Sequence, residues 1–524
     1  EASETHNLIH YLDDWASRAA DKPALITPVD LAASGHTITT FGDLHARMSR
    51  LASGLAAAGI RAGDRVILMV PMSQELYLLI LALLKMGAIT VFIDPWVGLK
   101  QLRACARLVE PACFVAPPLI QAAAALFHEF RGIPLKISSG GPFPGCARLA
   151  GVMAQGSERH ATCAVTPETT ALITFTTGSS GTPKGANRTH GFLEAQHLAL
   201  GHHMGHTPAD VDMPALPMFI LHNLAAGVTS IVPAMKPSRP ADVDPAAIMR
   251  QVREFGVTTM VGSPAYFDPI ARWLGARGER LDGVRAVFTG GGPVPPGLLG
   301  RLVPLMPDGT AYVGYGSTEA EPVALISARE VVLETGRMTD EGKGTCVGTL
   351  AEGLRARIVW DGADLPAGEI GEILVAGPHV NRDYYRNPEA VRENKIQEAD
   401  GTVWHRMGDL GYFDDRGRLW MVGRVHNRLV RGGVPLYPVM VEAVAQARPW
   451  VRKAALVGRP HAALGQEAVL AVEPAGTPDV AGLDAALRGA GFAIDRIVLQ
   501  GRLPVDPRHN TKIDYVRLAR TLGS

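Results

Sequence analysis

The sequence predicts an α/β protein that folds into at least two domains, and three observations lead to this prediction. The chain has 524 residues, more than one hydrophobic core ordinarily organises. From about residue 40, segments with helical periodicity alternate with short β-rich runs, an order that favours crossover connections and a mostly parallel sheet. After about residue 345, shorter β-like runs separated by turn residues predict a β-rich subdomain.

Helix-like and strand-like segments follow one another in the first half of the chain. The apolar residues of 41–60 and of 73–88 recur at helical spacing, and each segment precedes a β-rich run. The two β-rich runs are 64–70 and 90–95. The same alternation continues with strands at 170–177, 257–263 and 284–292 and a helix at 245–256. Ligands of open α/β sheets bind outside the carboxyl ends of the strands, so we look for the site in the turns that follow them.

A separate unit is predicted from about residue 428 onward. A helix at 437–447, strands at 453–458 and 467–474, and a helix at 481–491 follow one another there.

The charge balance and the cysteines narrow the class of protein. The 51 basic residues are matched by 51 acidic ones, so nothing in the composition predicts binding to nucleic acid. Five cysteines without a CxxC pair favour neither a disulfide framework nor a structural zinc site, and they fit the cytoplasm.

Residues 1–23 lack the pattern of a secretory signal and predict a helix. The apolar run at 76–84 is about half of the roughly 20 residues that span a bilayer, so it predicts a buried helix and no transmembrane segment.

The stretch FTTGSSGTPKGANRTH at 175–190 has the composition of an anion-binding loop. Its glycines let successive backbone N–H groups point at one spot, while hydroxyl side chains and a lysine add donors and positive charge. This combination favours a phosphate chain, although the stretch lacks the GxxxxGK[ST] pattern of nucleoside triphosphatases. A surface turn is the alternative. The residues we expect to bind the phosphates are Thr176, Thr177, Gly178, Ser179, Ser180, Gly181, Thr182 and Lys184.

Five motifs together resemble those of the adenylate-forming enzymes, the superfamily of acyl-CoA synthetases, firefly luciferase and nonribosomal-peptide adenylation domains. FTTGSSGTPKG resembles the family's phosphate loop. Its companions occur in the family's order: TGGGP at 289–293, GYGSTEAEP at 314–322, WHRMGDLGYFDDRGRLWMVGR at 404–424 and HNTKIDYVRLA at 509–519. The resemblance implies an N-terminal nucleotide- and acyl-binding domain over residues 1–424 with a β-rich subdomain at 345–424, a hinge at 425–428, and a mobile C-terminal domain at 429–524. It implies ATP and Mg²⁺ as cofactors.

The resemblance assigns roles around the STEAE sequence. Glu319 offers a hard carboxylate oxygen of the kind that Mg²⁺ takes beside phosphate oxygens, and the resemblance makes it the metal ligand; a solvated carboxylate is the alternative. The Thr318 hydroxyl is placed at the α-phosphate, so both residues are expected to be catalytic, and Tyr315 offers a face for stacking adenine. The other residues expected at the nucleotide, where glycines could also serve only a tight turn, are Gly291, Gly292, Pro293, Gly314, Gly316 and Ser317.

Four residues nearer the C-terminus complete the expected machinery. Asp409 matches the family aspartate that grips both ribose hydroxyls, although an exposed turn aspartate is the alternative. By resemblance, Arg424 is a second ribose or phosphate contact and Asn427 is the hinge residue. Lys512 corresponds to the family lysine that swings in and binds the substrate carboxylate and the α-phosphate; without the resemblance it would count as a surface residue. A positioned ammonium offsets the repulsion between these two anions.

Several stretches resemble one subgroup more closely, the β-lactone synthetases of the bacterial olefin hydrocarbon pathway. They are PAMKPSRPADVDPAAI at 233–248, GSPAYFDPIARW at 262–273, KGTCVG at 343–348 and PVDPRHNTKID at 504–514. Members of this subgroup adenylate a long-chain 2-alkyl-3-hydroxy acid, and its own 3-hydroxyl then displaces AMP. Ile220 stands where acyl-CoA synthetases often have a histidine, with His222 two residues on. The residues expected to bind substrate are Phe219, His222, Gly262 and Ser263, though ordinary core roles are the alternative.

Three functions therefore stay open at this point. The first is β-lactone synthesis, the second is thioester formation by a long-chain fatty acyl-CoA synthetase, and the third is a noncatalytic nucleotide- or lipid-binding scaffold. The joint presence of Thr318, Glu319, Asp409, Arg424 and Lys512 argues against the third. The expected partner is a long-chain fatty-acid carboxylate; a homodimer and association with enzymes of the same pathway are left open.

Overall fold

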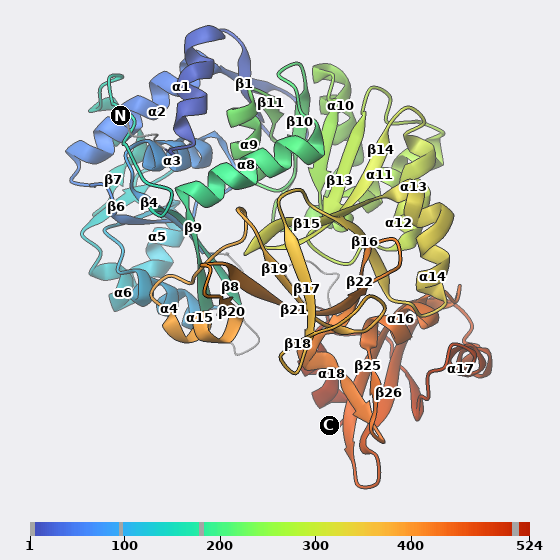
Figure 1. The fold of residues 1–524 in the computed structure, drawn as a ribbon. Coiled ribbons are helices and arrows are strands. Elements are labelled where there is room, and N and C mark those ends of the chain that lie inside the picture. The colour runs from blue at the N-terminus through green and yellow to red at the C-terminus, as the bar shows by residue number, and fades with distance from the viewer. Residues whose placement is uncertain (1–5, 94–97, 178–182, 506–512, 524) are drawn as a thin grey trace.

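The computed structural model describes residues 6–93, 98–177, 183–505 and 513–523. Within these residues the strands form three sheets with helices packed around them (Figure 1). We refer to them as the first sheet, the long sheet and the C-terminal sheet. The alternation of helices and strands agrees with the α/β architecture predicted from the sequence.

The first sheet has the strand order β7-β6-β5-β3-β4-β8-β9. Its strands are β3 (Arg65–Leu68), β4 (Ile89–Phe92), β5 (Cys113–Ala116), β6 (Leu135–Ser138), β7 (Ala147–Arg148), β8 (Thr170–Thr177) and β9 (Pro183–Thr189). The helices of this part of the chain are α1 (Ile9–Arg18), α2 (Phe41–Ala57), α3 (Gln74–Lys85), α4 (Leu99–Val109), α5 (Pro118–Ala124), α6 (His128–Arg131) and α7 (Leu149–Ala154). The apolar run at 76–84 lies inside α3 and is buried as expected.

Residues 183–189 form a strand, although the sequence placed them in the phosphate loop. They make up β9, which pairs antiparallel with β8, with Phe175 opposite Gly185 and Thr176 opposite Lys184. The segment has no β-like side-chain pattern, and it becomes a strand because its backbone completes hydrogen bonds with β8. The predicted residues Gly178, Ser179, Ser180, Gly181 and Thr182, which follow β8, lie outside the described residues.

The long sheet has the strand order β18-β17-β19-β21-β22-β16-β15-β14-β13-β12-β10-β11-β1-β2, with β20 paired to β21. Its strands are β1 (Pro23–Pro28), β2 (His36–Thr40), β10 (Val211–Pro214), β11 (Thr229–Ile231), β12 (Thr259–Gly262), β13 (Ala286–Gly290), β14 (Thr310–Ser317), β15 (Ala320–Ser327), β16 (Thr345–Leu350), β17 (Arg355–Trp360), β18 (Ala363–Asp364), β19 (Gly371–Ala376), β20 (Lys395–Gln397), β21 (Val403–Phe413) and β22 (Leu419–Arg424). Strands β10, β12, β13 and β14 are parallel, and from β14 through β16 to β22 the pairing is antiparallel.

Helices pack around the long sheet. Those near its parallel strands and the β14–β16 segment are α8 (His190–Met204), α9 (Phe219–Ala226), the short turn η1 (Pro240–Asp242), α10 (Pro245–Phe255), α11 (Pro264–Arg277), α12 (Pro296–Leu305), α13 (Ala328–Glu330), the π-helical turn η2 (Val331–Thr335) and α14 (Gly336–Asp340), whereas α15 (Pro388–Asn394) packs on β20 and β21. The β15–β16 pair joins the parallel strands to the β-rich strands, so the predicted β-rich segment continues a sheet that begins in the α/β part.

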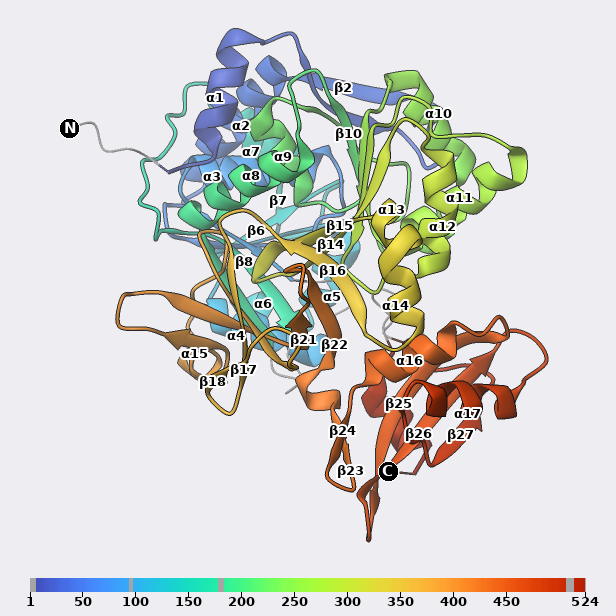
Figure 2. The ribbon, with the colours of Figure 1, turned by 45° about the vertical axis from the view of Figure 1, so that its right-hand side comes forward.

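The C-terminal residues form a smaller sheet with its own apolar core. The turn η3 (Val425–Asn427) leads into β23 (Leu429–Arg431), β24 (Val434–Leu436), β25 (Val451–His461), β26 (Gly465–Pro474) and β27 (Arg496–Leu499), with helices α16 (Pro438–Gln446), α17 (Val480–Gly489) and α18 (Tyr515–Thr521). In both views α16 lies beside α14, where this part meets the rest of the molecule (Figures 1 and 2). In the part of the chain that the structure describes, none of the helices combines the length and apolar character needed to cross a bilayer.

Candidate active site

The hairpin formed by β14 and β15 places the STEAE residues at the end of the parallel strands. Ser317 pairs with Ala320, so Thr318 and Glu319 form the turn. The backbone N–H of Glu319 donates to Ser317 Oγ at 3.3 Å, and Arg188 of β9 donates from Nη2 to the Thr318 carbonyl at 2.7 Å. The turn lies outside the carboxyl end of a parallel strand, where ligands of α/β sheets bind.

Glycines let the strands approach closely beside this turn. Gly290 of β13 stands opposite Gly314 of β14, and a Cβ at Gly290 would lie 2.6 Å from the Gly314 carbonyl oxygen. A Cβ at Gly316 would lie 2.7 Å from the Ala320 carbonyl oxygen. A Cβ at Gly314, by contrast, would meet no atom within 4 Å, so open space borders the middle of this strand. The predicted nucleotide residues Gly291, Gly292 and Pro293 follow β13 directly.

Asp409, Tyr315 and Arg424 come together although they are far apart in sequence. The Tyr315 hydroxyl donates to Asp409 Oδ2 at 2.7 Å, and Arg424 Nε lies 2.9 Å from Asp409 Oδ1. Arg424 stands opposite Asp409 in the β21–β22 pair and is half exposed, while Asp409 is buried. Burial, together with the charge of Asp409 and the hydrogen bond to it, raises the pKa of Tyr315. Tyr315 is therefore a hydroxyl donor that fixes Asp409.

Glu319 is buried inside a cage formed by the segment 380–385. The Tyr384 hydroxyl donates to Glu319 Oε1 at 3.1 Å, and the backbone N–H of Asn381 donates to the Glu319 carbonyl at 2.6 Å. Lys395 Nζ donates to the Asn381 carbonyl, and it lies 5.3 Å from the centroid of the Tyr384 ring. The sequence analysis missed Tyr384, Asn381 and Lys395, because no motif or spacing marks them.

The surroundings keep the Glu319 carboxyl ionised. Burial alone would raise the pKa of Glu319, but the charge of Lys395 and the Tyr384 hydrogen bond lower it below its usual range. Burial lowers the pKa of His405 to about 3, so its ring is neutral. Burial also lowers the pKa of Lys395 to about 7, while Glu319 and Asp383 act in the opposite direction.

An ionised, buried carboxylate is a donor that fits a hard divalent cation. In the described ranges, no group of three or more His, Cys, Asp or Glu side chains is placed to hold a metal ion. A cation at Glu319 would therefore take its remaining ligands from phosphate oxygens, as Mg²⁺ commonly does in nucleotide sites. The donor chemistry at Glu319 fits Mg²⁺ bound together with a nucleotide.

Lys184 lies near the ring of Tyr384, whose hydroxyl contacts Glu319 of the STEAE turn. Its Nζ is 3.1 Å from Glu393 Oε2 of α15 and 6.0 Å from the centroid of the Tyr384 ring. The predicted phosphate lysine and the predicted metal ligand Glu319 therefore both contact the same tyrosine side chain. Thr176 and Thr177 end β8, where their backbones face Lys184 and Pro183.

Apolar side chains gather on the sheet face that carries Tyr312. The Phe288 and Tyr312 rings stack with centroids 5.2 Å apart, and Phe219 packs on this cluster together with Leu216. The buried members of the cluster are Leu200, Met204, Val261, Ala286 and Phe288. Such an apolar cluster is suited to contact an acyl chain.

The predicted substrate residues Gly262 and Ser263 connect β12 to α11. The Ser263 hydroxyl caps α11 by accepting from the backbone N–H of Tyr266 at 3.3 Å. A Cβ at Gly262 would lie 2.6 Å from the Tyr266 ring, so the helix packs directly on this glycine. Both residues have packing roles, and their predicted contact with substrate stays a prediction.

His222 lies within a chain of three histidines, of which His197 and His222 are buried and His206 is partly buried. His197 Nδ1 is 3.0 Å from His222 Nδ1, and His222 Nε2 is 3.3 Å from His206 Nδ1. His206 Nε2 is 3.0 Å from the Thr259 hydroxyl, which donates to Asp212 Oδ1 at 2.7 Å.

The carboxylate at the end of this chain fixes the hydrogen on every ring. Since Thr259 donates to Asp212, its oxygen accepts from His206 Nε2–H. His206 Nδ1 then accepts from His222, and His222 Nδ1 accepts from His197. Burial lowers the pKa of His197 and of His206 to about 4 and raises the pKa of Asp212 to about 6.

Asn427 and Lys512 belong to the C-terminal part of the predicted machinery. Asn427 ends the η3 turn between β22 and β23, directly after the strand that carries Arg424. Lys512 lies outside the described residues, so its predicted contacts stay predictions.

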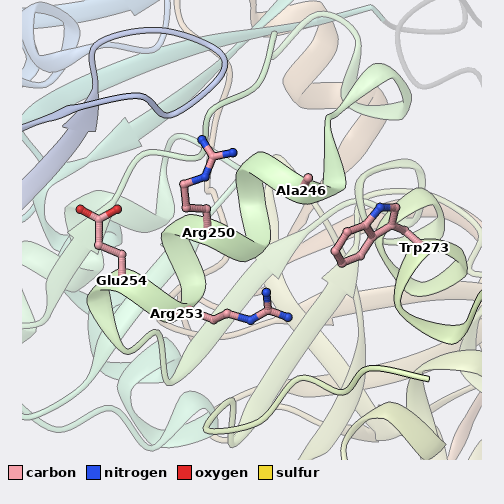
Figure 3. A pocket seen from close by; sticks show the side chains of 5 residues that line it. All are labelled: Ala246, Arg250, Arg253, Glu254 and Trp273. Atoms are coloured by element: carbon pink, nitrogen blue, oxygen red, sulfur yellow. The ribbon is translucent and has the colours of Figure 1, made fainter. Parts of the chain in front are cut away.

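A surface hollow of about 440 Å³ lies away from these residues, between α10 and α11 (Figure 3). It is lined by Ala246, Arg250, Arg253, Glu254 and Trp273. Arg253 is paired with Glu279, Arg250 donates to the Ala32 carbonyl, and Glu254 is 3.6 Å from the His36 ring. None of the predicted site residues lines this hollow.

Comparison with known proteins decides the family of this site. The sequence model of a family described as AMP-binding enzyme matches residues 12–385. The chain belongs to this family. It is an AMP-forming ligase, and the adenylate-forming resemblance drawn from its motifs is confirmed.

Curated relatives in this family match nearly the whole chain. An olefin beta-lactone synthetase of Xanthomonas campestris pv. campestris is 37% identical and covers 98% of this chain and 97% of the relative. One of Stenotrophomonas maltophilia is 37% identical, with 91% and 90% covered. A feruloyl-CoA synthase of an Amycolatopsis species is 30% identical, with 88% and 89% covered.

Solved structures confirm the fold class of the family. The ATP-bound MatB of Rhodopseudomonas palustris has a TM-score of 0.82 at 25% identity and covers 99% of each chain. The amide bond synthetase McbA of Marinactinospora thermotolerans has a TM-score of 0.83 at 24% identity and covers 99% of this chain and 100% of its own.

Proposed function

We propose that the protein uses ATP to close a β-lactone ring on a long-chain 3-hydroxy fatty acid. The acid is first adenylated, and its own 3-hydroxyl then displaces AMP. The observation that carries this proposal is the 37% identity, over 98% of the chain, to a protein named olefin beta-lactone synthetase. The apolar cluster around Phe288 and Tyr312 supports an acyl substrate beside the nucleotide residues.

Adenylation joins the acid to the α-phosphorus of ATP. A carboxylate oxygen attacks phosphorus, a new P–O bond forms, and pyrophosphate leaves with the electron pair of the bond that breaks. Asp409, held by Tyr315 and Arg424, accepts from the ribose hydroxyls, and the Thr318 hydroxyl donates to an α-phosphate oxygen. Lys512 offsets the repulsion between carboxylate and phosphate. Mg²⁺, held by Glu319, supplies positive charge to the phosphates when it is bound.

Ring closure needs no second substrate. The 3-hydroxyl oxygen attacks the acyl carbon, the bond to AMP breaks, and the hydroxyl proton is released. Tethering a nucleophile to its electrophile gives effective concentrations of about 10⁵–10⁸ M when the geometry is right, which favours closure over attack by an external acceptor. Ile220 has a hydrocarbon side chain and is fully buried in the core, so this position offers no polar contact to an external thiol.

A fatty acyl-CoA synthetase is the second candidate function. The similarity to a feruloyl-CoA synthase at 30% identity favours it, and it shares the adenylation step. The two functions differ only in the group that attacks the acyl-adenylate.

Product identification decides between these functions. The purified protein is incubated with ATP, Mg²⁺ and a 2-alkyl-3-hydroxy fatty acid, with and without coenzyme A. We expect β-lactone, AMP and pyrophosphate without the thiol. Strict dependence on coenzyme A would select the synthetase, and absence of AMP release with every fatty acid tested would leave a noncatalytic nucleotide- or lipid-binding scaffold.

We further propose a moving C-terminal domain. Residues 1–424 would form the nucleotide- and acyl-binding domain, residues 425–428 the hinge with Asn427, and residues 429–524 the mobile domain that brings in Lys512. The separate apolar core around Leu456 and Leu470 supports a unit of this extent. The proposal places the enzyme in the cytoplasm beside enzymes of the same pathway.

A further inference from the structure

The segment 380–385 connects the two sheets that meet at the site. Its Val380 bridges to Ala320 of β15, and its Tyr384 bridges to Ala186 of β9. The backbone N–H of Tyr385 donates to the Gly185 carbonyl at 2.8 Å. The segment thus links the STEAE hairpin to the strand that carries Lys184, and it surrounds Glu319 on the way.

Lys395 contacts this segment through a hydrogen bond to its backbone. It is the first residue of β20, its side chain is buried, and its Nζ donates to the Asn381 carbonyl. The ammonium also faces the ring of Tyr384, whose hydroxyl contacts Glu319. Each end of the cage around Glu319 is therefore in contact with Lys395.

Lys395 is also the buried cation whose charge acts most directly on Glu319. Glu319 comes first among the charges that act on Lys395. His405, which stands opposite Lys395 in the β20–β21 pair, is neutral. Arg188 is the other buried cation at the hairpin, and Glu321 comes before Glu319 among the charges that act on it. A buried carboxylate needs such a compensating charge, because burying it alone is costly.

We propose that Lys395 is the internal counter-ion of Glu319 and a positioning residue for the divalent cation that the nucleotide brings. This inference rests on the proposed function, in which Glu319 binds Mg²⁺. The positive charge of Lys395 compensates the negative charge of Glu319 before the cation binds. Once the cation is bound, the same charge repels it. It therefore limits how strongly metal and nucleotide reinforce each other's binding.

Removal of the Lys395 charge should change nucleotide binding in a defined direction, both without and with metal. Without metal, Lys395→Met weakens binding of the anionic nucleotide, because one positive charge near the phosphates is lost. With metal, the same substitution removes a repulsion between two cations. Both effects increase the ratio of the nucleotide dissociation constant without metal to that with metal. At an effective dielectric constant near 20, even two unit charges about 10 Å apart interact strongly enough to alter such a ratio about tenfold.

The test measures binding without turnover. Calorimetry at pH 6, below the pKa of Lys395, gives the dissociation constant of α,β-methylene-ATP in EDTA and in Mn²⁺, with no fatty acid present. We expect the ratio of these constants to rise about tenfold or more in Lys395→Met and to stay near the wild-type value in Lys395→Arg. Lys85→Met is the matched control, because Lys85 is equally buried but pairs with Asp13. It should lower stability and leave the ratio unchanged.

The outcomes separate this inference from the proposed function. An unchanged or smaller ratio in Lys395→Met, with the metal effect intact in the wild type, would overturn the counter-ion role alone. If the wild-type protein bound no nucleotide analogue in either condition, the proposed function itself would fall. Should Lys395→Met not fold, Lys395→Gln, which keeps a donor for the Asn381 carbonyl, is measured in the same way, and an unchanged ratio there would likewise overturn the role.

Discussion

Both oxygens of Asp409 are held by protein groups. Tyr315 donates to one oxygen, and Arg424 contacts the other from the neighbouring strand. Hydrogen bonds to a carboxylate are about twice as strong as neutral ones, so these contacts orient the side chain before any ligand arrives. In the proposed function this orientation aims Asp409 at the ribose, and it makes Tyr315 more than a stacking surface.

The Tyr315 hydroxyl can be removed without removing the ring. We expect Tyr315→Phe to weaken ATP binding about tenfold, corresponding to about 1.4 kcal/mol, because Asp409 loses a charge-assisted hydrogen bond. Fluorescence titration with a labelled nucleotide measures the effect. Tyr312→Phe, on the same strand, is the control and should bind as the wild type does. Equal affinities in the two variants would show that the hydroxyl has no part in nucleotide binding.

Strand β16 is the element that joins the parallel strands to the β-rich strands. It pairs with β15 on one edge and with β22 on the other, and its register shifts between Cys346 and Gly348. Gly348 has φ +91, and a Cβ there would lie 1.9 Å from the Leu325 carbonyl oxygen. Both the backbone conformation and the space therefore require glycine at this junction.

Gly348→Ala tests the junction. We expect a loss of about 3 kcal/mol or more in unfolding free energy, because a side chain there forces β15 and β16 apart. Gly362→Ala is the control, since Gly362 has φ +82 but open space around a Cβ, so that only backbone strain of about 1–2 kcal/mol applies. Urea unfolding of both variants gives the difference, and similar losses would show that contact at Leu325 is unimportant.

The elements were predictable where a side-chain pattern sets them. The strand predicted at 170–177 coincides with β8, and the helices expected from 41 and 245 begin there as α2 and α10. Strand β9 was missed because backbone pairing, rather than side-chain alternation, creates it. Two features of the site could not be predicted, because they depend on contacts between segments that are far apart in the sequence. They are the hydrogen bond of Tyr315 to Asp409 and the cage that Tyr384, Asn381 and Lys395 form around Glu319.

In the whole molecule, a buried carboxyl group holds the last helix to the C-terminal sheet. Glu442 of α16 accepts from the Tyr515 hydroxyl of α18 at 2.7 Å and from the backbone N–H of Leu456 at 2.9 Å. Burial raises the pKa of Glu442 to about 7, although both hydrogen bonds act in the opposite direction. Near pH 7 this group is therefore close to half protonated in the folded protein.

The raised pKa makes stability depend on pH. The folded protein holds this proton more tightly than the unfolded chain, so the contribution of Glu442 is fully present below about pH 4.5 and is lost as the pH rises through about 7. Glu442→Gln should abolish this decline, which amounts to on the order of 3 kcal/mol. Urea unfolding at intervals from pH 5 to pH 8 measures it. Tyr515→Phe keeps the carboxyl and should keep the decline; parallel pH profiles for Glu442→Gln and the wild type would contradict this origin.

The unbroken pairing from β14 to β22 has a mechanical consequence for nucleotide recognition. Tyr315 stands on β14 and Asp409 on β21, and the strands between them are hydrogen-bonded neighbours throughout. In the proposed function, base and sugar would therefore rest on one continuous frame of paired strands, which a movement of the proposed mobile domain would leave intact. Any adjustment that the proposed domain movement requires would then fall to the groups that approach this frame from outside, and nucleotides would be selected before that movement.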